Sequence, residues 1–329
     1  MSHRHHLERA LELAERGRAT VKPNPVVGAV VVRDGEVVGE GWHTRPGEPH
    51  AEVIALAAAG ERARGATLYV TLEPCAHHGR TPPCADAIAE AGVARVLCAA
   101  HDPDPRTDGR GFARLREAGI DVVLVEGDLA DRARRQNEAF RTWAAKRRPF
   151  VTYKAAMTLD GRLAAAGGDA RWVSGEASRR LVHELRAASD AVAVGMGTVR
   201  AENPALTARE VDAERQPRRI AFGSGPLPEG SDLELLSGPL DDELARLADE
   251  EVQSLLLEGG PTLAGAFLRA DLIDKLVLFV ATKLVGGDDA PPVFAGPGAR
   301  MLADAVPVSA LEVGHAGDDV VLIGYVHEP

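Results

Sequence analysis

Three potential metal ligands that lie far apart in the sequence restrict how the first half of this chain can fold. His50-Ala51-Glu52 is followed by Pro74-Cys75 and then by Pro83-Cys84. One imidazole and two thiolates are the protein ligands of a catalytic zinc site, whose fourth position stays open for water. A fold that uses these ligands has to bring positions 50, 75 and 84 together. We expect such a cluster near the starts of two helices.

A histidine-x-glutamate followed by a proline-cysteine step is typical of zinc-dependent nucleobase deaminases, whose two cysteines are separated by two residues. In this chain eight residues, 76–83, stand between Cys75 and Cys84. Zinc bound by these ligands lowers the pKa of water toward neutrality. Glu52 would then take the water proton, protonate a ring nitrogen and relay a proton to the leaving amine.

Two other interpretations of these residues stand beside this one. A closed structural zinc site needs a fourth ligand, which His77 or His78 would supply, and cysteines also serve as packing residues. We favour the catalytic site, because histidine-x-glutamate and two proline-cysteine steps rarely coincide. His77 and His78 are therefore interpreted as loop or substrate-contacting residues, and Cys98 as a core residue of an apolar strand.

Composition excludes several classes of function. A formal net charge of −11 argues against a nucleic-acid-binding protein, which needs a basic surface to neutralise phosphates. No apolar stretch reaches the length that spans a bilayer, and the N-terminus lacks the apolar core of a secretory signal. Three cysteines, two of them in the motif, leave no disulfide framework. We expect a cytoplasmic enzyme with a small-molecule substrate.

The chain of 329 residues is long enough for two domains, and Arg147-Arg148-Pro149 is a natural boundary. Helix patterns cover 7–17, 51–59, 83–91 and 131–147, the last as one charged helix. Strand patterns cover 26–32, 36–42, 67–72, 94–100 and 121–125, and Asp34-Gly35 predicts a hairpin between the first two. We predict one domain over 1–147 and a second over 148–329.

The second half alternates strands and helices, which implies an α/β domain. Strands are expected over 150–156, 191–195, 220–222, 254–258, 275–281 and 320–327. Helices are expected over 175–188, 240–250 and 262–268. Leu257-Glu258-Gly259-Gly260-Pro261-Thr262 predicts a buried strand, a glycine turn and a helix start. Bare amides at such a helix start suit phosphate or pyrophosphate, although an ordinary strand–helix turn has the same pattern.

The motifs together resemble the bifunctional riboflavin-biosynthesis deaminase–reductase family, and the resemblance covers nearly the whole chain. In the first half it rests on five segments: Pro23-Asn24-Pro25-x-Val27-Gly28, Gly47 to Glu52, Thr71 to Cys84, His101-Asp102-Pro103-x-Pro105 and Gly109-Arg110-Gly111. In the second half it rests on Lys154, Thr158-Leu159-Asp160-Gly161-Arg162, Gly195-x-Gly197-Thr198-Val199, Asn203-Pro204-x-Leu206-Thr207 and Lys283-Leu284-x-Gly286-Gly287. It implies a cytidine-deaminase-like α/β/α domain followed by a dihydrofolate-reductase-like α/β domain.

The resemblance implies two reactions. The first domain would remove the 2-amino group of 2,5-diamino-6-ribosylamino-4(3H)-pyrimidinone 5′-phosphate with the help of Zn²⁺. The second would reduce the ribosyl group to the ribityl chain, with NADPH delivering a hydride to the C1′ imine form of the sugar. Lys154 would donate a proton to the sugar oxygen or polarise it, and Glu202 would orient it. A surface ion pair is the alternative role for each.

The resemblance also implies which residues contact the ligands. NADPH would contact Ala156, Trp172, Thr198, Glu202, Ser224, Gly260, Pro261, Thr262, Leu263, Ala264, Gly265 and Ala266. The substrate would contact Asn24, Ala170, Arg186, Leu206, Arg209 and Glu258. Arg186 and Arg209 would bind its phosphate, since arginine forks match phosphate oxygens.

The second half departs from the family pattern. Glu202 stands where the family usually has Asp, and Phe222-Gly223-Ser224 stands where a strand usually ends in Asp-Ser. The region 223–253 is shortened, consistent with the loss of about one βα unit. A working reductase is the main prediction. The alternatives are a deaminase whose second domain only binds ligand or mediates oligomerisation, and a nucleic-acid-editing deaminase. We expect a homo-oligomer, with no nucleic-acid or membrane partner.

Overall fold

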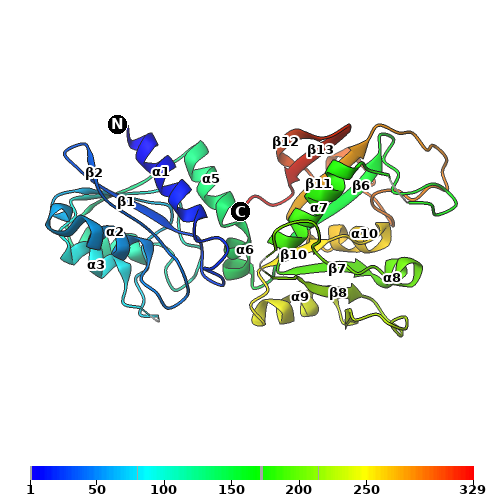
Figure 1. Cartoon of the computed structure of the whole chain (residues 1–329), viewed down its shortest axis with the longest axis horizontal. Coiled ribbons are helices and arrows are strands. Elements are labelled where there is room, and N and C mark those ends of the chain that lie inside the picture. Colours follow the sequence, from blue (N-terminus) through cyan, green and yellow to red (C-terminus); the bar gives the residue numbers. More distant parts are fainter. Residues whose placement is uncertain (1, 80, 171–172, 214) are drawn as a thin grey trace. The chain divides into compact units, whose positions relative to one another are not determined.

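The computed structural model describes residues 2–79, 81–170, 173–213 and 215–329. The chain divides into two compact units, Met1–Arg147 and Arg148–Glu328, each with its own sheet and its own hydrophobic core (Figure 1). None of the helices in these ranges combines the length and apolar character that crossing a bilayer requires.

The first unit is built around a five-stranded sheet of order β2-β1-β3-β4-β5. β1 pairs antiparallel with β2 and β3, whereas β3, β4 and β5 run parallel. The strands are β1 Gly28–Arg33, β2 Glu36–Trp42, β3 Thr67–Val70, β4 Arg95–Cys98 and β5 Asp121–Leu124. The helices are α1 His3–Glu15, α2 Ala51–Ala59, η1 Gly60–Ala63, α3 Cys84–Glu90, α4 Arg110–Glu117, α5 Asp128–Gln136 and α6 Glu138–Lys146.

Glycines on the first two strands let helices rest directly on both faces of this sheet. A Cβ at Gly28 would lie 2.0 Å from Ala10 O of α1. On β2, a Cβ at Gly39 or Gly41 would lie 2.1 Å or 2.4 Å from backbone oxygens of α2. Gly41 pairs with Ala29, the neighbour of Gly28, so α1 and α2 cover opposite faces. This is the α/β/α layering that the resemblance implied.

The single helix expected over 131–147 is wrong, because the structure has α5 and α6 with a break at Asn137. Asn137 lies outside the helical region, with φ −114° and ψ 23°. Its side chain is buried and bonds both backbone groups of Val26: Oδ1 accepts from Val26 N at 2.9 Å and Nδ2 donates to Val26 O at 2.9 Å. A contact more than a hundred residues away in sequence therefore interrupts a helical pattern.

The second unit contains an eight-stranded sheet of order β12-β13-β11-β6-β10-β7-β8-β9. The strands from β11 to β9 in this order run parallel, and β13 and β12 add an antiparallel edge. The strands are β6 Phe150–Thr158, β7 Ala191–Gly195, β8 Arg218–Phe222, β9 Glu234–Leu236, β10 Ser254–Leu257, β11 Lys275–Ala281, β12 Ser309–Ala316 and β13 Asp319–Tyr325. The helices are α7 Glu176–Ala188, α8 Met196–Glu202, α9 Leu240–Asp249, α10 Pro261–Arg269 and η2 Leu302–Asp304.

The shortened region 223–253 still contributes the edge strand β9 to the sheet. β9 pairs parallel with β8, and α9 follows it and leads into β10. The sequence patterns had not indicated β9, β12, α4 or α8, of which β9, α4 and α8 are short and β12 is exposed. Figure 1 shows α8 at the ends of β7 and β8, the place where a site in such a sheet forms.

Because α2 rests on Gly41, we expect Gly41→Ala to destabilise the first unit by about 1–3 kcal/mol through overpacking. The same substitution at Gly197 is a matched control, since a Cβ there meets nothing within 4 Å and alanine favours the helix. Urea unfolding followed by circular dichroism measures both. Equal midpoints for Gly41→Ala and the parent would contradict the close packing of α2 on β2.

Candidate active sites

The structure brings His50, Cys75 and Cys84 together in the first unit. His50 Nδ1 lies 3.1 Å from Cys84 Sγ and 3.6 Å from Cys75 Sγ. All three ligand atoms lie within 4.8 Å of one another. Zn–N and Zn–S bonds of about 2.0 and 2.3 Å at tetrahedral angles hold ligand atoms roughly 3.5–3.8 Å apart. The donor set and its spacing therefore fit a zinc ion.

Local backbone contacts explain how the two cysteines meet despite the long insertion. Cys84 is the first residue of α3, and its N–H donates to Cys75 Sγ at 3.3 Å. The next N–H, of Ala85, donates to Cys75 O at 3.1 Å. Hydrogen bonding from Cys84 and from His50 lowers the pKa of the Cys75 thiol to about 4. Cys75 is therefore a thiolate, the form that binds zinc.

Helix α2 supplies both the histidine ligand and the carboxylate. His50 caps the start of α2, with Nδ1 toward the sulfurs and Nε2 3.4 Å from Thr81 Oγ1. Glu52 lies in the first turn and is 3% exposed. Burial raises the pKa of Glu52 to about 7, where a carboxyl group both accepts and donates protons. The arrangement suits a residue that moves protons beside the metal.

Asn24 reaches this centre through His43, which the sequence motifs had not identified. Asn24 Nδ2 lies 2.9 Å from His43 Nε2, and His43 Nδ1 lies 3.2 Å from Pro49 O. The carbonyl can only accept, so Nδ1 carries the proton and Nε2 accepts from Asn24. Burial, and then the neighbouring His50, lowers the pKa of His43. A neutral imidazole and an amide therefore line the approach to His50.

A second residue that the sequence analysis missed is Glu73, whose side chain is fully buried. Its carboxylate accepts from His101 Nδ1 and from the backbone N–H groups of Asp102, Gly109 and Phe112, at 3.2–3.4 Å. These donors follow β4 and enter α4. Glu73 thus joins two segments that leave neighbouring parallel strands, directly before the Cys75 loop. A glutamate between a strand and a proline is also a common surface residue, so sequence alone gave no signal.

The remaining candidates of the first unit have other positions. Among the described residues, only His50, Cys75 and Cys84 bring metal-ligating atoms together. His77 Nδ1 instead lies 3.3 Å from Thr107 Oγ1. The three ligands present therefore agree with a catalytic zinc site whose fourth position is open, rather than with a closed structural site. Cys98 is completely buried in the hydrophobic core, as expected for a packing residue.

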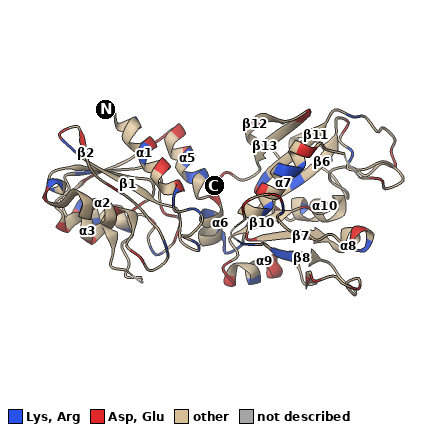
Figure 2. Cartoon of the chain, in the orientation of Figure 1, with Lys and Arg blue, Asp and Glu red and all other residues tan. Residues whose placement is uncertain are grey.

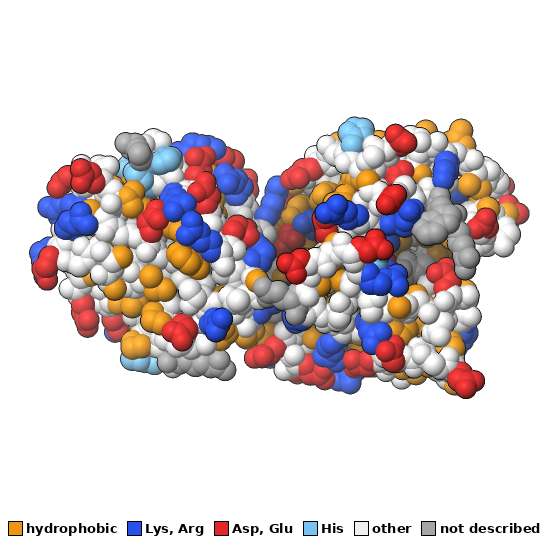
Figure 3. Space-filling view, in the orientation of Figure 1, with side chains coloured by type: hydrophobic (Ala, Val, Ile, Leu, Met, Phe, Trp, Pro, Cys, Tyr) orange, Lys and Arg blue, Asp and Glu red, His pale blue; other side chains and the backbone are white. Residues whose placement is uncertain are grey.

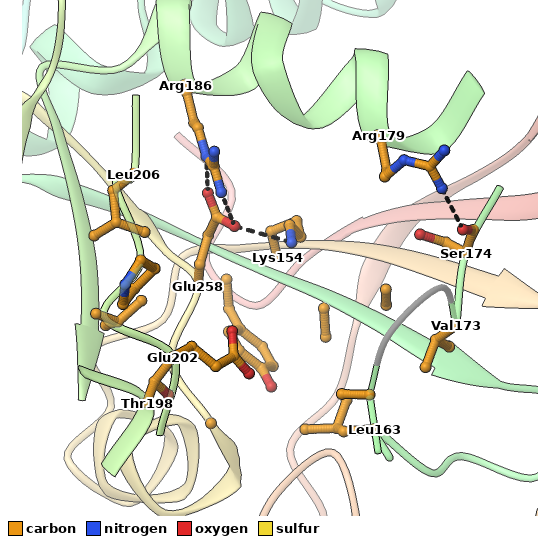
Figure 4. Close-up of a pocket in the computed structure, with 18 residues that line it drawn as sticks. Lys154, Leu163, Val173, Ser174, Arg179, Arg186, Thr198, Glu202, Leu206 and Glu258 are labelled. Carbon is orange, nitrogen blue, oxygen red and sulfur yellow. Dashed lines mark hydrogen bonds and ion pairs between the residues drawn. The ribbon is translucent and has the colours of Figure 1, made fainter. Parts of the chain in front are cut away.

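The second unit has a cavity of about 600 Å³ at the carboxyl ends of β6, β7 and β10. Parallel sheets place their ligands at such ends. Nine of the predicted reductase residues line it: Lys154, Ala156, Ala170, Arg186, Thr198, Glu202, Leu206, Glu258 and Gly260. In Figure 4 Arg186 and Lys154 converge on Glu258, while Thr198 and Glu202 lie together on another wall.

Glu258 stands at the centre of an ion-pair network. Its carboxylate lies 3.0 Å from Lys154 Nζ and accepts from Arg186 Nε and Nη2 at 2.6 and 3.0 Å (Figure 4). Burial raises its pKa, but Lys154 and Arg186 outweigh this and lower the pKa of Glu258 to about 2. The carboxylate that contacts Lys154 is therefore Glu258, while Glu202 is exposed at the end of α8.

Arg186 does not present a free fork to a phosphate in this structure, contrary to expectation. Its Nε and Nη2 bond Glu258, and its Nη1 donates to Thr207 O at 3.2 Å. Arg209 is exposed, and its N–H donates to His183 Nδ1. Arg209 is not among the described residues that line the cavity.

The expected contact run from Gly260 to Ala266 is only partly at the cavity. Gly260, with Gly259, lines it, whereas Ala264 is buried in the core and its N–H donates to Gly260 O. A Cβ on Gly265 would lie 2.0 Å from Ala295 O, so that glycine serves helix packing. The remaining residues of the run lie outside the lining: Pro261, Thr262, Leu263 and Ala266. Ser224 also lies outside it. Trp172 falls outside the described residues.

Comparison with known proteins agrees with both sites. Residues 149–322 match the family model described as RibD C-terminal domain. Residues 1–100 match the cytidine and deoxycytidylate deaminase zinc-binding region. The riboflavin biosynthesis protein RibD of Escherichia coli is 43% identical over 365 aligned positions, covering 98% of this chain and 99% of the relative. The chain belongs to the RibD family.

Solved RibD structures share the whole architecture. An Acinetobacter baumannii RibD has a TM-score of 0.84 at 37% identity, covering 98% of both chains. A Thermotoga maritima protein, described as a diaminohydroxyphosphoribosylaminopyrimidine deaminase/5-amino-6-(5-phosphoribosylamino)uracil reductase, has a TM-score of 0.81 at 35% identity. It covers 98% of this chain and 99% of that one. The predicted family and the two-part α/β fold are therefore confirmed.

We expect Cys84→Ala to reduce bound zinc from about one ion per chain to a small fraction, because two ligands hold zinc poorly. Cys98→Ala is the matched control, since it removes a thiol of the same unit that lies outside the ligand cluster. Zinc is measured by plasma mass spectrometry after dialysis against a weak chelator. Equal zinc loss in both variants would show that folding, rather than ligation, is responsible.

Proposed function

We propose that this RibD chain uses its two sites in succession on one phosphorylated pyrimidine. By family it is a zinc-dependent deaminase and an NADPH-dependent reductase of riboflavin biosynthesis. The first step is hydrolytic deamination of 2,5-diamino-6-ribosylamino-4(3H)-pyrimidinone 5′-phosphate, and the second reduces the ribosyl group to ribityl. The observation that supports the assignment of roles is the buried Glu52 beside His50, Cys75 and Cys84.

In the deaminase site the metal supplies Lewis acidity that makes water nucleophilic near neutral pH. His50, Cys75 and Cys84 would hold it. Glu52, with a pKa near 7, accepts the proton that water loses and returns a proton to the ring and to the departing ammonia. Asn24, held by His43, donates toward the pyrimidine.

In the reductase site NADPH supplies the hydride. Lys154 stands in the cavity wall, and its Nζ lies 3.0 Å from the Glu258 carboxylate. A protonated lysine donates to the sugar oxygen as the C1′ centre is reduced. Arg186 restrains the Glu258 carboxylate by a two-point contact and so fixes Lys154 through it. Glu202 and Thr198 form the α8 wall of the cavity and would contact a bound NADPH.

The deaminase-only alternative is not supported, because the RibD C-terminal match covers most of the second unit and its sheet is continuous through β9. For a nucleic-acid-editing deaminase a basic stripe is needed, and the face in Figure 3 carries acidic and basic side chains interspersed. The expected reducing cytoplasm suits Cys75 and Cys84, which bind zinc only as reduced thiolates.

We also propose that two chains associate through β12. This strand is the edge of the sheet and pairs within the chain with β13, so its outer backbone groups face away from the sheet. It and the preceding segment carry large exposed apolar side chains, 43–92% accessible: Met301, Leu302, Val306, Val308, Leu311 and Val313. Antiparallel pairing with the same strand of a second copy covers this surface with two-fold symmetry.

Glu52→Gln and Lys154→Met separate the two activities and serve as controls for each other. We expect Glu52→Gln to lower ammonia release by about 10²–10⁴-fold, with zinc retained and reduction of supplied deaminated pyrimidine unchanged. Lys154→Met should keep ammonia release and lose NADPH oxidation. Both rates are measured on purified full-length protein. Loss of both activities in either variant would refute the assignment of that residue to one site.

For the association, we expect the parent to sediment as two chains of 34.7 kDa and the double variant Leu311→Lys/Val313→Lys as one. Two lysines on each β12 introduce like charges across the strand pair. Val37→Lys, at an exposed valine of the first unit, is the control and should stay dimeric. A parent that sediments as a single chain would contradict the proposal.

A further inference from the structure

Helix α7 carries part of the reductase cavity, and its start has no side-chain cap of its own. Arg179 and Arg186 of α7 line the cavity. Val173 and Ser174, directly before the helix, line it as well (Figure 4). The N-cap residue is Gly175, which has no side chain to bond the free N–H groups of the first turn. The start of α7 is therefore held by contacts from elsewhere in the chain.

The main polar contact comes from Asp319, which lies 144 residues after Gly175 and begins β13. Its Oδ2 accepts from the N–H of Gly175 at 2.7 Å and from the hydroxyl of Ser178 at 2.5 Å. In a capping box, a glutamate or glutamine at the third helical position accepts from the N–H of the N-cap residue. Ser178 occupies that position in α7, and Asp319 takes the place of the missing carboxylate.

This contact is buried. Asp319 is 5% exposed, and Ser178 is fully buried. The turn between β12 and β13 lies against the first turn of α7, since a Cβ on Gly317 would lie 3.5 Å from the Cβ of Ala177. If the Asp319 carboxylate were removed, a buried N–H and a buried hydroxyl would lose their acceptor, which is costly away from water. The start of α7 would then shift to find other partners.

The remaining contacts of α7 with the sheet are apolar. One cluster joins the helix to β11 and β13: Val182, Val277, Phe279 and Val321. Apolar contact is non-directional, so it keeps the helix on the sheet without fixing its position along its own axis. The two hydrogen bonds to Asp319 have defined directions. They therefore fix where the first turn of α7 lies.

The position of α7 is coupled to the cavity at both ends of the helix. Near its start, Arg179 Nη1 donates to Ser174 O at 3.0 Å and so ties the preceding wall segment to the helix. Near its end, Arg186 holds the Glu258 carboxylate through Nε and Nη2. Figure 2 shows the basic positions along α7. A shift of the helix would displace this wall and the Glu258 ion pair together.

We propose that Asp319 is a positioning residue of the reductase: it caps α7 and thereby holds the cavity wall and Arg186 in the arrangement that binds the pyrimidine substrate. The inference rests on the proposed reductase function of the second unit. Asp319 is not among the described residues that line the cavity, so it acts through the helix.

The kinetic test compares Asp319→Ala, Asp319→Asn and Asp318→Ala in the full-length protein. Alanine removes the acceptor, whereas the side-chain oxygen of asparagine can accept both hydrogen bonds, because one oxygen of Asp319 accepts both. Asp318 is an exposed residue of the same turn and is the matched control. We expect Asp319→Ala to raise the KM for supplied deaminated pyrimidine about tenfold, with kcat and ammonia release close to those of the parent. Asp319→Asn and Asp318→Ala should keep the KM of the parent.

Hydrogen exchange gives a second measurement that does not depend on activity. We expect Asp319→Ala to exchange about tenfold faster than the parent in residues 173–180, while β6 and β10 exchange as in the parent.

A merely structural role would lower the amount of folded enzyme, and with it the apparent kcat, at an unchanged KM. That result overturns the inference, and so does faster exchange throughout the second unit or a raised KM in Asp319→Asn equal to that in Asp319→Ala. If the parent oxidises NADPH with substrate in these cases, the proposed reductase function stands. If the parent does not oxidise NADPH, both fail.

Discussion

Two backbone N–H groups at the start of α3 donate to one residue, Cys75, and the first active centre depends on this contact. Without it, an insertion of eight residues would let the two thiols separate, and the loss of loop entropy on closing it would oppose zinc binding. With it, the Cys75 sulfur is held against Cys84 by the chain itself. The insertion is then free to shape the pocket rather than to connect the ligands. Glu73 completes the support from the other side, because it fastens the strand that leads to Cys75 to the segment after β4.

In the second unit, ion pairs rather than a metal hold the functional side chains in position. β10 and β6 are parallel neighbours in which Leu257 pairs with Tyr153. Glu258, directly after β10, therefore stands beside Lys154 in the middle of β6. A buried carboxylate is costly unless it is paired and hydrogen-bonded, and Glu258 has both cationic partners within 3.0 Å. Removing Arg186 would leave the Glu258–Lys154 pair free to reorient. Arg186, which the family resemblance assigned to the substrate phosphate, is therefore already engaged in holding the Glu258 carboxylate.

The sequence predicted most structural features that depend on neighbouring residues and few of those that depend on contacts between distant residues. The zinc ligands, Glu52 and most strands of both sheets, though not β9 and β12, follow from spacing and periodicity, which are properties of neighbouring residues. The break at Asn137 depends on Val26, and the role of Glu73 depends on N–H groups of Asp102 to Phe112, so neither is visible in a local window. β12 was missed because its alternation of apolar and polar residues is limited to Leu311, Glu312 and Val313, which is too short to predict a strand. The family resemblance predicted the reductase residues but not the ion pairs between them.

The departures in the second half leave the sheet intact. A shortened 223–253 segment would have opened the sheet if β9 had been lost, but β9 still pairs with β8 and α9 still leads into β10. What changes is the turn after β8, where Gly223 stands in place of the usual Asp and Gly225 lets Arg200 lie close to the backbone. Glu202, one methylene longer than aspartate, ends α8 just before Asn203, whose left-handed conformation at φ +41° fixes where the helix stops. One helix therefore carries Arg200 on the side of the β8 turn and Glu202 on the side of the cavity.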